Sequence, residues 1–189
     1  RGHVAKGSTD SSSQCDHQYL LEHGVCSSGQ TLKFVLQQNR KAMNKRRQAK
    51  PMRTVWFMTG NAGKVREAKY ALEPLGFDVQ QLRVDGVDIM EPQCDDLETV
   101  ARSKLQQAKL HLPDSKDALL VEDAGLFVDD LNGFPGVYSA YVLKTLGCEG
   151  MLKVMEDNMN RNAHFQAVAA LLLDGEVHVS KGICRGTLA

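Results

Sequence analysis

Six residues that follow a short apolar run have the composition of an anion-binding loop. The run TVWFM, residues 54–58, is followed by Thr-Gly-Asn-Ala-Gly-Lys at 59–64 and then by a helical pattern. Gly60 and Gly63 allow the backbone to approach a ligand, and a helix start presents N–H groups with partial positive charge. Lys64 adds a full charge within the first turn. The segment matches neither GxxxxGK[ST] nor GxGxxG, so an ordinary strand-to-helix turn remains the alternative to a phosphate-binding loop.

Acidic side chains that suit a metal ion occur in two later places. Glu91 follows the segment DIM, and Glu122 and Asp123 come at the end of the apolar strand ALLVE. Carboxylates at the carboxyl end of a strand lie where open α/β sheets usually bind ligands. Two or three such groups suit Mg²⁺, which prefers oxygen ligands and bridges to substrate phosphates. Solvated loop charge is the alternative for any one acid, but a phosphate loop and an acid pair in one chain support each other.

A third segment, GLFVDDLNGFPGVYSAY at residues 125–141, contains three glycines and a proline among apolar residues. Such a run is costly in conformational entropy unless a specific loop is needed. It therefore either wraps an edge of the sheet or lines a cleft.

Alternating strand and helix patterns must position these groups. Asp96 is a predicted N-cap, and Asp174-Gly175 is a strong hairpin signal between two strand patterns. Strands alternating with helices and closing on a hairpin predict an α/β fold with a mixed sheet. The predicted strands cover residues 54–58, 77–84, 118–122, 164–173 and 176–184, and the predicted helices cover 65–75, 97–108, 138–147 and 149–158.

The chain of 189 residues divides into two parts of different composition. Residues 1–53 carry 10 Lys/Arg against 3 Asp/Glu and are rich in Ser and Gln, whereas residues 54–189 carry 13 against 20. The first part is therefore predicted to be a disordered or non-native extension, with Met52 as a plausible natural start. The second part is long enough for one globular domain.

Cysteine usage indicates the cellular compartment of the chain, and hydropathy indicates whether it can span a membrane. The five cysteines form no CxxC pair, and the sequence shows no signal-peptide pattern, so no disulfide framework is predicted and a cytoplasmic location is expected. The longest apolar run, AVAALLL at residues 167–173, is too short to span a bilayer.

Four segments together resemble the inosine triphosphate pyrophosphatase family. They are TGNAGK, Glu91 within DIMEPQCDDLETVARSK, VEDAGLFVDDLNGFPGVYSAY and NRNAHF. They occur in the family's order and spacing over nearly all of residues 54–189, and SAYVLKTLGCEGMLKVME is similar to archaeal-type members. The resemblance implies a hydrolase that converts ITP, dITP and XTP to the monophosphate and pyrophosphate, and so cleans the nucleotide pool.

The resemblance also implies roles for single residues. Glu91 and Asp123 are the expected Mg²⁺ ligands, and Asp123 also accepts the proton of the attacking water. A nearby cation is expected to keep Asp123 ionised, which makes it a modest base. Ala124 is expected to contact substrate, and Lys104 is a further candidate for a phosphate contact, although helical register also allows it to face solvent. The expected triphosphate loop consists of Thr59, Gly60, Asn61, Ala62, Gly63 and Lys64.

The implied fold is an elongated α/β domain with a long mixed sheet and two lobes flanking a substrate cleft, commonly assembled as a homodimer. The chain departs from the family pattern where it ends, at KGICRGTLA. Family members continue into a GFGYDP-type segment and a Ser-His-Arg motif, which hold the purine base. We therefore expect residues 54–189 to be C-terminally incomplete, with the triphosphate half of the site present and apolar surface left exposed.

Two alternatives depend on the first part of the chain. The basic run at residues 40–50 would add affinity for nucleic acid, so a non-catalytic nucleotide- or RNA-binding protein is the alternative function. The presence of both Glu91 and Asp123 favours catalysis, because a simple binder has less need of a paired metal site. The expected partners are therefore a purine nucleoside triphosphate and a second copy of the chain, without a membrane or nucleic-acid partner. The residues Cys15, His17, His23 and Cys26 include zinc-ligand types, but their spacing is irregular.

Overall fold

The computed structural model describes residues 53–84 and 89–189. Their strands form one mixed sheet in the order β2-β1-β3-β5-β6, with β4 paired to β3. Strand β1 is parallel to both β2 and β3, whereas β3, β5 and β6 are successively antiparallel. The predicted mixed α/β fold is therefore confirmed. The strands are β1 (Arg53–Met58), β2 (Phe77–Leu82), β3 (Ala118–Val128), β4 (Pro135–Gly136), β5 (Asn162–Leu173) and β6 (Glu176–Thr187).

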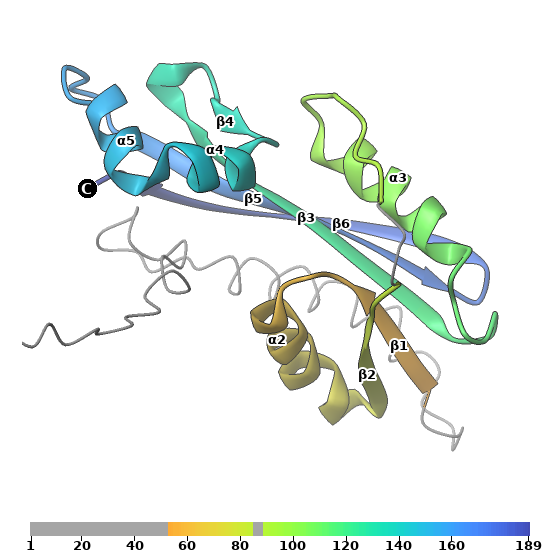
Figure 1. Ribbon diagram of the computed structural model, residues 1–189. Coiled ribbons are helices and arrows are strands. Elements are labelled where there is room, and N and C mark those ends of the chain that lie inside the picture. Colours follow the sequence, from red (N-terminus) through yellow and green to blue (C-terminus); the bar gives the residue numbers. More distant parts are fainter. Residues whose placement is uncertain (1–52, 85–88) are drawn as a thin grey trace, which may run out of the picture.

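The helices lie at both ends and on both sides of this sheet (Figure 1). Strands β3, β5 and β6 run the length of the domain, with β1, β2 and α2 at one end and β4, α4 and α5 at the other. This arrangement gives the elongated shape with two lobes. The helices are α2 (Ala62–Leu72), α3 (Leu97–Lys109), α4 (Ser139–Thr145) and α5 (Gly147–Val154), with short 3-10 helices η2 (Glu73–Leu75) and η3 (Asp129–Leu131).

Local sequence signals fix several element boundaries. The Asn61 side chain accepts hydrogen bonds from the second and third residues of α2, and Asp96 does the same for α3 through Glu98 N and Thr99 N. Asn and Asp are among the best N-caps because they satisfy amides that have no partner within the helix. Asp174 and Gly175 have φ of 53° and 83°, as a two-residue hairpin turn requires. The predicted cap at Asp96 and the predicted hairpin are both confirmed.

The apolar core has three parts that anchor the helices. Helix α2 packs through Ala68 and Leu72 against β1, β2 and β3. Helix α3 packs through residues such as Leu105 against the part of β3 that contains Leu119 and Val121. Helices α4 and α5 pack against the far end of β3 and β5, where Phe165 is buried. Each helix is therefore held on the sheet by burial of its apolar face. This packing sets the direction of the polar side chains next to that face.

Strand β3 is much longer than the predicted segment 118–122, and this difference shapes the site. It continues to Val128 because β5 pairs with it along its length, from Leu119 to Val128. Strand β1 ends at Met58, opposite Val121. The two acids after Val121 therefore lie within β3, at the point where its parallel neighbour stops, and not at the carboxyl end of a strand as predicted.

Glycine at position 125 is required by close packing of β4 on β3. A Cβ atom added at Gly125 would lie 2.3 Å from the carbonyl oxygen of Gly136, and backbone cannot move away as a side chain can. We expect Gly125→Ala to lower the free energy of unfolding by about 2 kcal/mol, measured by urea denaturation. Gly60→Ala is the matched control, since a Cβ there meets nothing within 4 Å; equal stability loss in both variants would contradict the packing argument.

None of the helices within the described residues is long and apolar enough to cross a membrane. The predicted extension at residues 1–53 and the Cys/His group within it lie outside the described residues, except for Arg53, the first residue of β1.

Candidate active site beside strand β3

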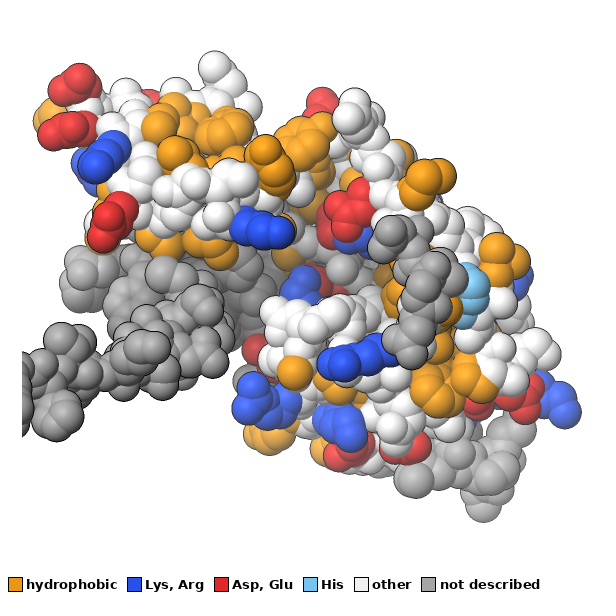
Figure 2. Space-filling model, viewed as in Figure 1, with side chains coloured by type: hydrophobic (Ala, Val, Ile, Leu, Met, Phe, Trp, Pro, Cys, Tyr) orange, Lys and Arg blue, Asp and Glu red, His pale blue; other side chains and the backbone are white. Residues whose placement is uncertain are grey.

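A pocket of about 550 Å³ opens where β1 ends and β3 continues. Its walls come from the loop after β1, the segment after β2, helix α3, the middle of β3 and residues 137–140. Figure 2 shows this face, on which acidic and basic side chains gather in the hollow between the lobes. The Gly/Pro-containing segment therefore lines the cleft through Val137, Ser139 and Ala140, one of the two possibilities that its sequence allowed.

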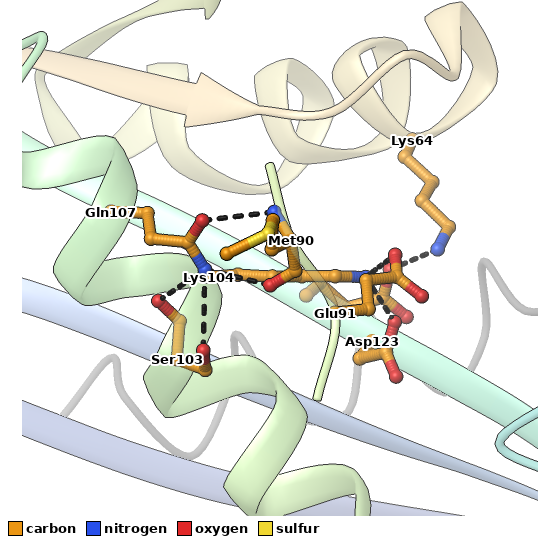
Figure 3. Close-up of polar contacts among 8 residues, drawn as sticks. Lys64, Met90, Glu91, Ser103, Lys104, Gln107 and Asp123 are labelled. Carbon is orange, nitrogen blue, oxygen red and sulfur yellow. Dashed lines mark hydrogen bonds and ion pairs between the residues drawn. The ribbon is translucent and has the colours of Figure 1, made fainter. Parts of the chain in front are cut away.

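Two lysines from different helices enter the pocket. Each is paired with an acid of β3, and one of them also contacts an acid in the segment before α3. The Lys104 ammonium, from α3, lies 2.6 Å from Asp123 Oδ1 and 2.7 Å from Glu91 Oε1. Lys64, from the first turn of α2, forms an ion pair with Glu122. Figure 3 shows the two lysines approaching the carboxylates from opposite sides. Glu91, Lys104 and Asp123, which are far apart in the sequence or come from different elements, thus meet at one point.

Burial and pairing act in opposite directions on Asp123 and Lys104. Burial raises the pKa of Asp123, and the attraction of Lys104 opposes this without cancelling it, so that the net pKa lies above the usual 3.8. Burial lowers the pKa of Lys104, but the Asp123 and Glu91 carboxylates outweigh it, so that this pKa is raised and the ammonium stays charged. Burial therefore outweighs the attraction of Lys104 at Asp123, and the expectation that a nearby cation makes this group only a modest base stays a prediction.

The expected triphosphate loop is organised by Asn61. Its Oδ1 accepts hydrogen bonds from Gly63 N at 2.8 Å and Lys64 N at 3.4 Å. These two amides are thus satisfied within the loop, and the expectation that the helix start offers them free to an anion is wrong. The same cap explains Gly63, where a Cβ would come within 3.0 Å of Asn61 Oδ1. Within the loop, Lys64 is the residue that brings positive charge to the pocket wall.

The structure brings most of the expected site residues to the pocket wall, and two lie away from it. Ala62 and Gly63 are not among the lining residues, although they belong to the same helix start. Among the described residues, no group of three or more His, Cys, Asp or Glu side chains is arranged to hold a metal ion. The expected site residues on the wall are Thr59, Gly60, Asn61, Lys64, Glu91, Lys104, Asp123 and Ala124.

Two glutamines that the sequence analysis did not identify hold the site together. Gln107 accepts from Met90 N at 2.9 Å and donates to Met90 O at 2.7 Å, which fastens the residue next to Glu91 onto α3 (Figure 3). Gln81 donates to Thr59 O at 2.6 Å and so ties the phosphate loop to β2. No sequence pattern indicates these contacts, because each joins residues far apart in the chain.

The histidines and cysteines among the described residues lie apart from the pocket wall. His111, His164 and His178 are absent from the lining residues within the described part of the chain. Cys94 and Cys148 form no disulfide bond within the described residues. Cys184 is disulfide-bonded, which corrects the expectation that the cysteines form no disulfide framework.

Comparison with known proteins gives one consistent result. The sequence pattern of the Ham1 family matches residues 55–189. A dITP/XTP pyrophosphatase of Thermococcus kodakarensis is 46% identical over 133 residues, which cover 70% of this chain and 68% of that protein. The dITP/XTP pyrophosphatase of Pyrococcus horikoshii is 37% identical over 71% of this chain and 69% of that protein. The Staphylococcus aureus Ham1 protein has a similar structure, with a TM-score of 0.61, 27% identity and 72% of each chain covered. The chain therefore belongs to the Ham1 family.

Proposed function

We propose that this chain hydrolyses non-standard purine nucleoside triphosphates, ITP, dITP and XTP, to the nucleoside monophosphate and pyrophosphate, and so cleans the nucleotide pool. The observation that carries the proposal is the meeting of Lys64, Glu91, Lys104 and Asp123 in one pocket beside the loop 59–64. Membership of the Ham1 family, and the names of the archaeal relatives, support the substrate class.

The chemistry requires one base and several positive charges. Water adds at phosphorus, the anhydride bond between the α- and β-phosphates breaks, and pyrophosphate leaves with the bonding electrons. Asp123 takes the proton from water. Lys64 and Lys104 offset the negative charge that develops on the leaving pyrophosphate. Positioning and charge therefore carry much of the acceleration.

Glu91 and Asp123 fit a magnesium ion that is shared with the substrate. Their carboxylate oxygens already converge on one cation, the Lys104 ammonium, so the geometry suits positive charge. Mg²⁺ is usually held by one or two carboxylates together with substrate phosphates and water, which agrees with the absence of a larger ligand group among the described residues. When bound, the ion supplies positive charge against the phosphate oxygens.

The test is pyrophosphate release from ITP, XTP, ATP and GTP, with Mg²⁺ and with chelator. We expect metal-dependent release that is faster from ITP and XTP than from ATP and GTP. A folded protein that releases pyrophosphate from none of them would remove the enzyme proposal and favour a nucleotide-binding role. Equal rates from all four would remove the proposed substrate class alone.

Gln107→Leu is expected to raise the Mg²⁺ concentration needed for half-maximal rate without a large change in kcat. The substitution releases Met90 from α3 and lets the adjacent Glu91 move, and loss of such supporting contacts typically weakens metal affinity by about 10-fold or more. The measurement is the Mg²⁺ concentration for half-maximal rate. Gln106→Leu, at an exposed position of the same helix, is the control, and an equal shift there would show that the effect is not specific.

We also propose that the chain acts as a homodimer, as its resemblance to the family implies, and that it acts in the cytoplasm, the compartment expected from its cysteine usage. Size-exclusion chromatography with light scattering tests the assembly, and a monomer at micromolar concentration would contradict it. Fractionation of the source cells tests the compartment.

A further inference from the structure

The buried carboxylate of Glu122 lies beside the pocket and has no part in the chemistry described above. Its side chain is 0% exposed, and neither oxygen accepts a hydrogen bond from any group within residues 53–84 and 89–189. The compensating charge is the Lys64 ammonium, with which it forms an ion pair. A buried carboxylate without a cation is costly, so burial ties Glu122 to Lys64.

Lys64 is consequently held at both ends. Its backbone N–H is capped by Asn61, and its ammonium is paired with Glu122 on β3, the central strand of the sheet. A lysine has a flexible stem and a strongly hydrated ammonium, so without an internal partner a lysine in the first turn of a helix extends into water. The pair with Glu122 instead keeps the side chain only 19% exposed, against the pocket wall.

Adjacent acids on β3 serve different lysines. Successive residues of a strand point to opposite faces, and here Glu122 pairs with Lys64 from α2 whereas Asp123 pairs with Lys104 from α3. Glu91, the second expected metal ligand, contacts Lys104 and belongs to the Asp123 side. Glu122 thus has a different ion-pair partner from the two carboxylates that suit a metal ion.

We infer that Glu122 is a positioning residue: it holds Lys64 in the pocket, ready to contact the triphosphate, and is not a ligand of the metal ion. The inference rests on the proposed function, in that it assigns Lys64 to a triphosphate substrate. A lysine ordered before the ligand arrives loses less conformational entropy on binding. Glu122 therefore contributes to affinity although it repels phosphate by its own charge.

Glu122→Gln tests this, because glutamine has the same size without the charge. We expect the Kd for inorganic tripolyphosphate, measured by calorimetry, to rise about tenfold, since Lys64 must then be ordered during binding. The KM for ITP should rise by a similar factor, because Lys64 contacts the triphosphate before any bond breaks. Glu156→Gln, at an exposed position after α5, is the control and leaves both quantities unchanged.

A double-variant comparison separates positioning from a general structural effect. If Glu122 acts through Lys64, then Glu122→Gln causes no further loss of tripolyphosphate affinity in a Lys64→Met background. The Mg²⁺ concentration for half-maximal rate stays at its parent value in Glu122→Gln. Thermal unfolding checks that each variant is folded, and if Lys64→Met is not, the comparison of Glu122→Gln with the parent decides alone.

Several outcomes would overturn the inference. The first is an unchanged or lower Kd for tripolyphosphate in Glu122→Gln, and the second is a tenfold rise in that Kd when Glu122→Gln is added to Lys64→Met. The others are a large shift in the Mg²⁺ concentration for half-maximal rate in Glu122→Gln, and a parent chain that does not bind tripolyphosphate. Tripolyphosphate binding requires no turnover. A parent chain that binds it but releases no pyrophosphate from nucleotides would therefore count against the proposed function and leave the role of Glu122 open to the same measurement.

Discussion

Asp123→Asn is expected to lower kcat for pyrophosphate release from ITP about 10³-fold, because removing a general base typically costs 10²- to 10⁴-fold. Asparagine keeps the shape of the side chain but accepts no proton, and it leaves Lys104 paired with Glu91 alone. The measurement is steady-state release at saturating Mg²⁺, with Asp157→Asn, at an exposed position after α5, as the control. A variant that kept more than about a tenth of the parent rate would remove Asp123 as the base.

The same substitution is expected to leave the fold as stable as before, or more so. The pKa of Asp123 is raised in the folded state, chiefly by burial, so ionising this group opposes folding. The cost begins as the pH rises above the ordinary value of 3.8 and is complete above the raised pKa. At neutral pH, asparagine removes that cost, and the gain should disappear as the pH falls towards 3.8. Metal-free thermal unfolding over this pH range checks the sign, and a variant less stable than the parent at neutral pH would contradict it.

Lys104→Met is expected to lower both the activity and the stability of the protein. Mg²⁺ is expected to restore the stability. Loss of one charge that stabilises the transition state costs about 10²-fold in kcat. The substitution also leaves two carboxylates facing each other without their cation. We expect the free energy of unfolding in chelator to fall by about 2 kcal/mol, between the values for exposed and buried pairs, which is a decrease of about 4–8 °C in Tm.

Mg²⁺ distinguishes this explanation from a simple packing defect. In the parent chain, a metal ion must displace Lys104 from Glu91 and Asp123, whereas in the variant the two acids are free to bind it. Mg²⁺ without nucleotide should therefore raise the Tm of Lys104→Met more than that of the parent. Lys109→Met, at an exposed position of the same helix, should show neither effect. A decrease in Tm that Mg²⁺ does not reverse would contradict the proposed competition.

Local signals predicted much of the fold and missed what depends on distant contacts. The cap at Asp96 and the turn at Asp174-Gly175 follow from nearby residues alone, and both are confirmed. The length of β3 was underestimated because Asp123, Ala124 and Gly125 interrupt the apolar pattern, and only pairing with β5 shows that the strand continues. Two amides at the start of α2 were expected to be free for a ligand. The Asn61 side chain caps the helix instead and accepts hydrogen bonds from both of them, Gly63 N and Lys64 N.

The candidate site was predictable as residue types and less so as contacts. The loop at 59–64 and the acids at 91 and 123 could be named from the sequence, whereas helical register left Lys104 open between solvent and the site. The packing of α3 on β3 directs it inward. The role of Gln107 depends on a backbone 17 residues away, and no sequence pattern indicates such a contact.

The path of β3 past the end of β1 also limits how this domain can change in length. Glu122 and Asp123 reach different lysines only because they are consecutive residues of a strand whose pairing with β1 and β5 is fixed. Insertion or deletion of one residue between Ala118 and Val121 would turn each acid towards the partner of the other. Changes in chain length should therefore be tolerated in the turn at Asp174-Gly175 and excluded from this part of β3, which a library of single-residue insertions, selected for pyrophosphate release, would reveal directly.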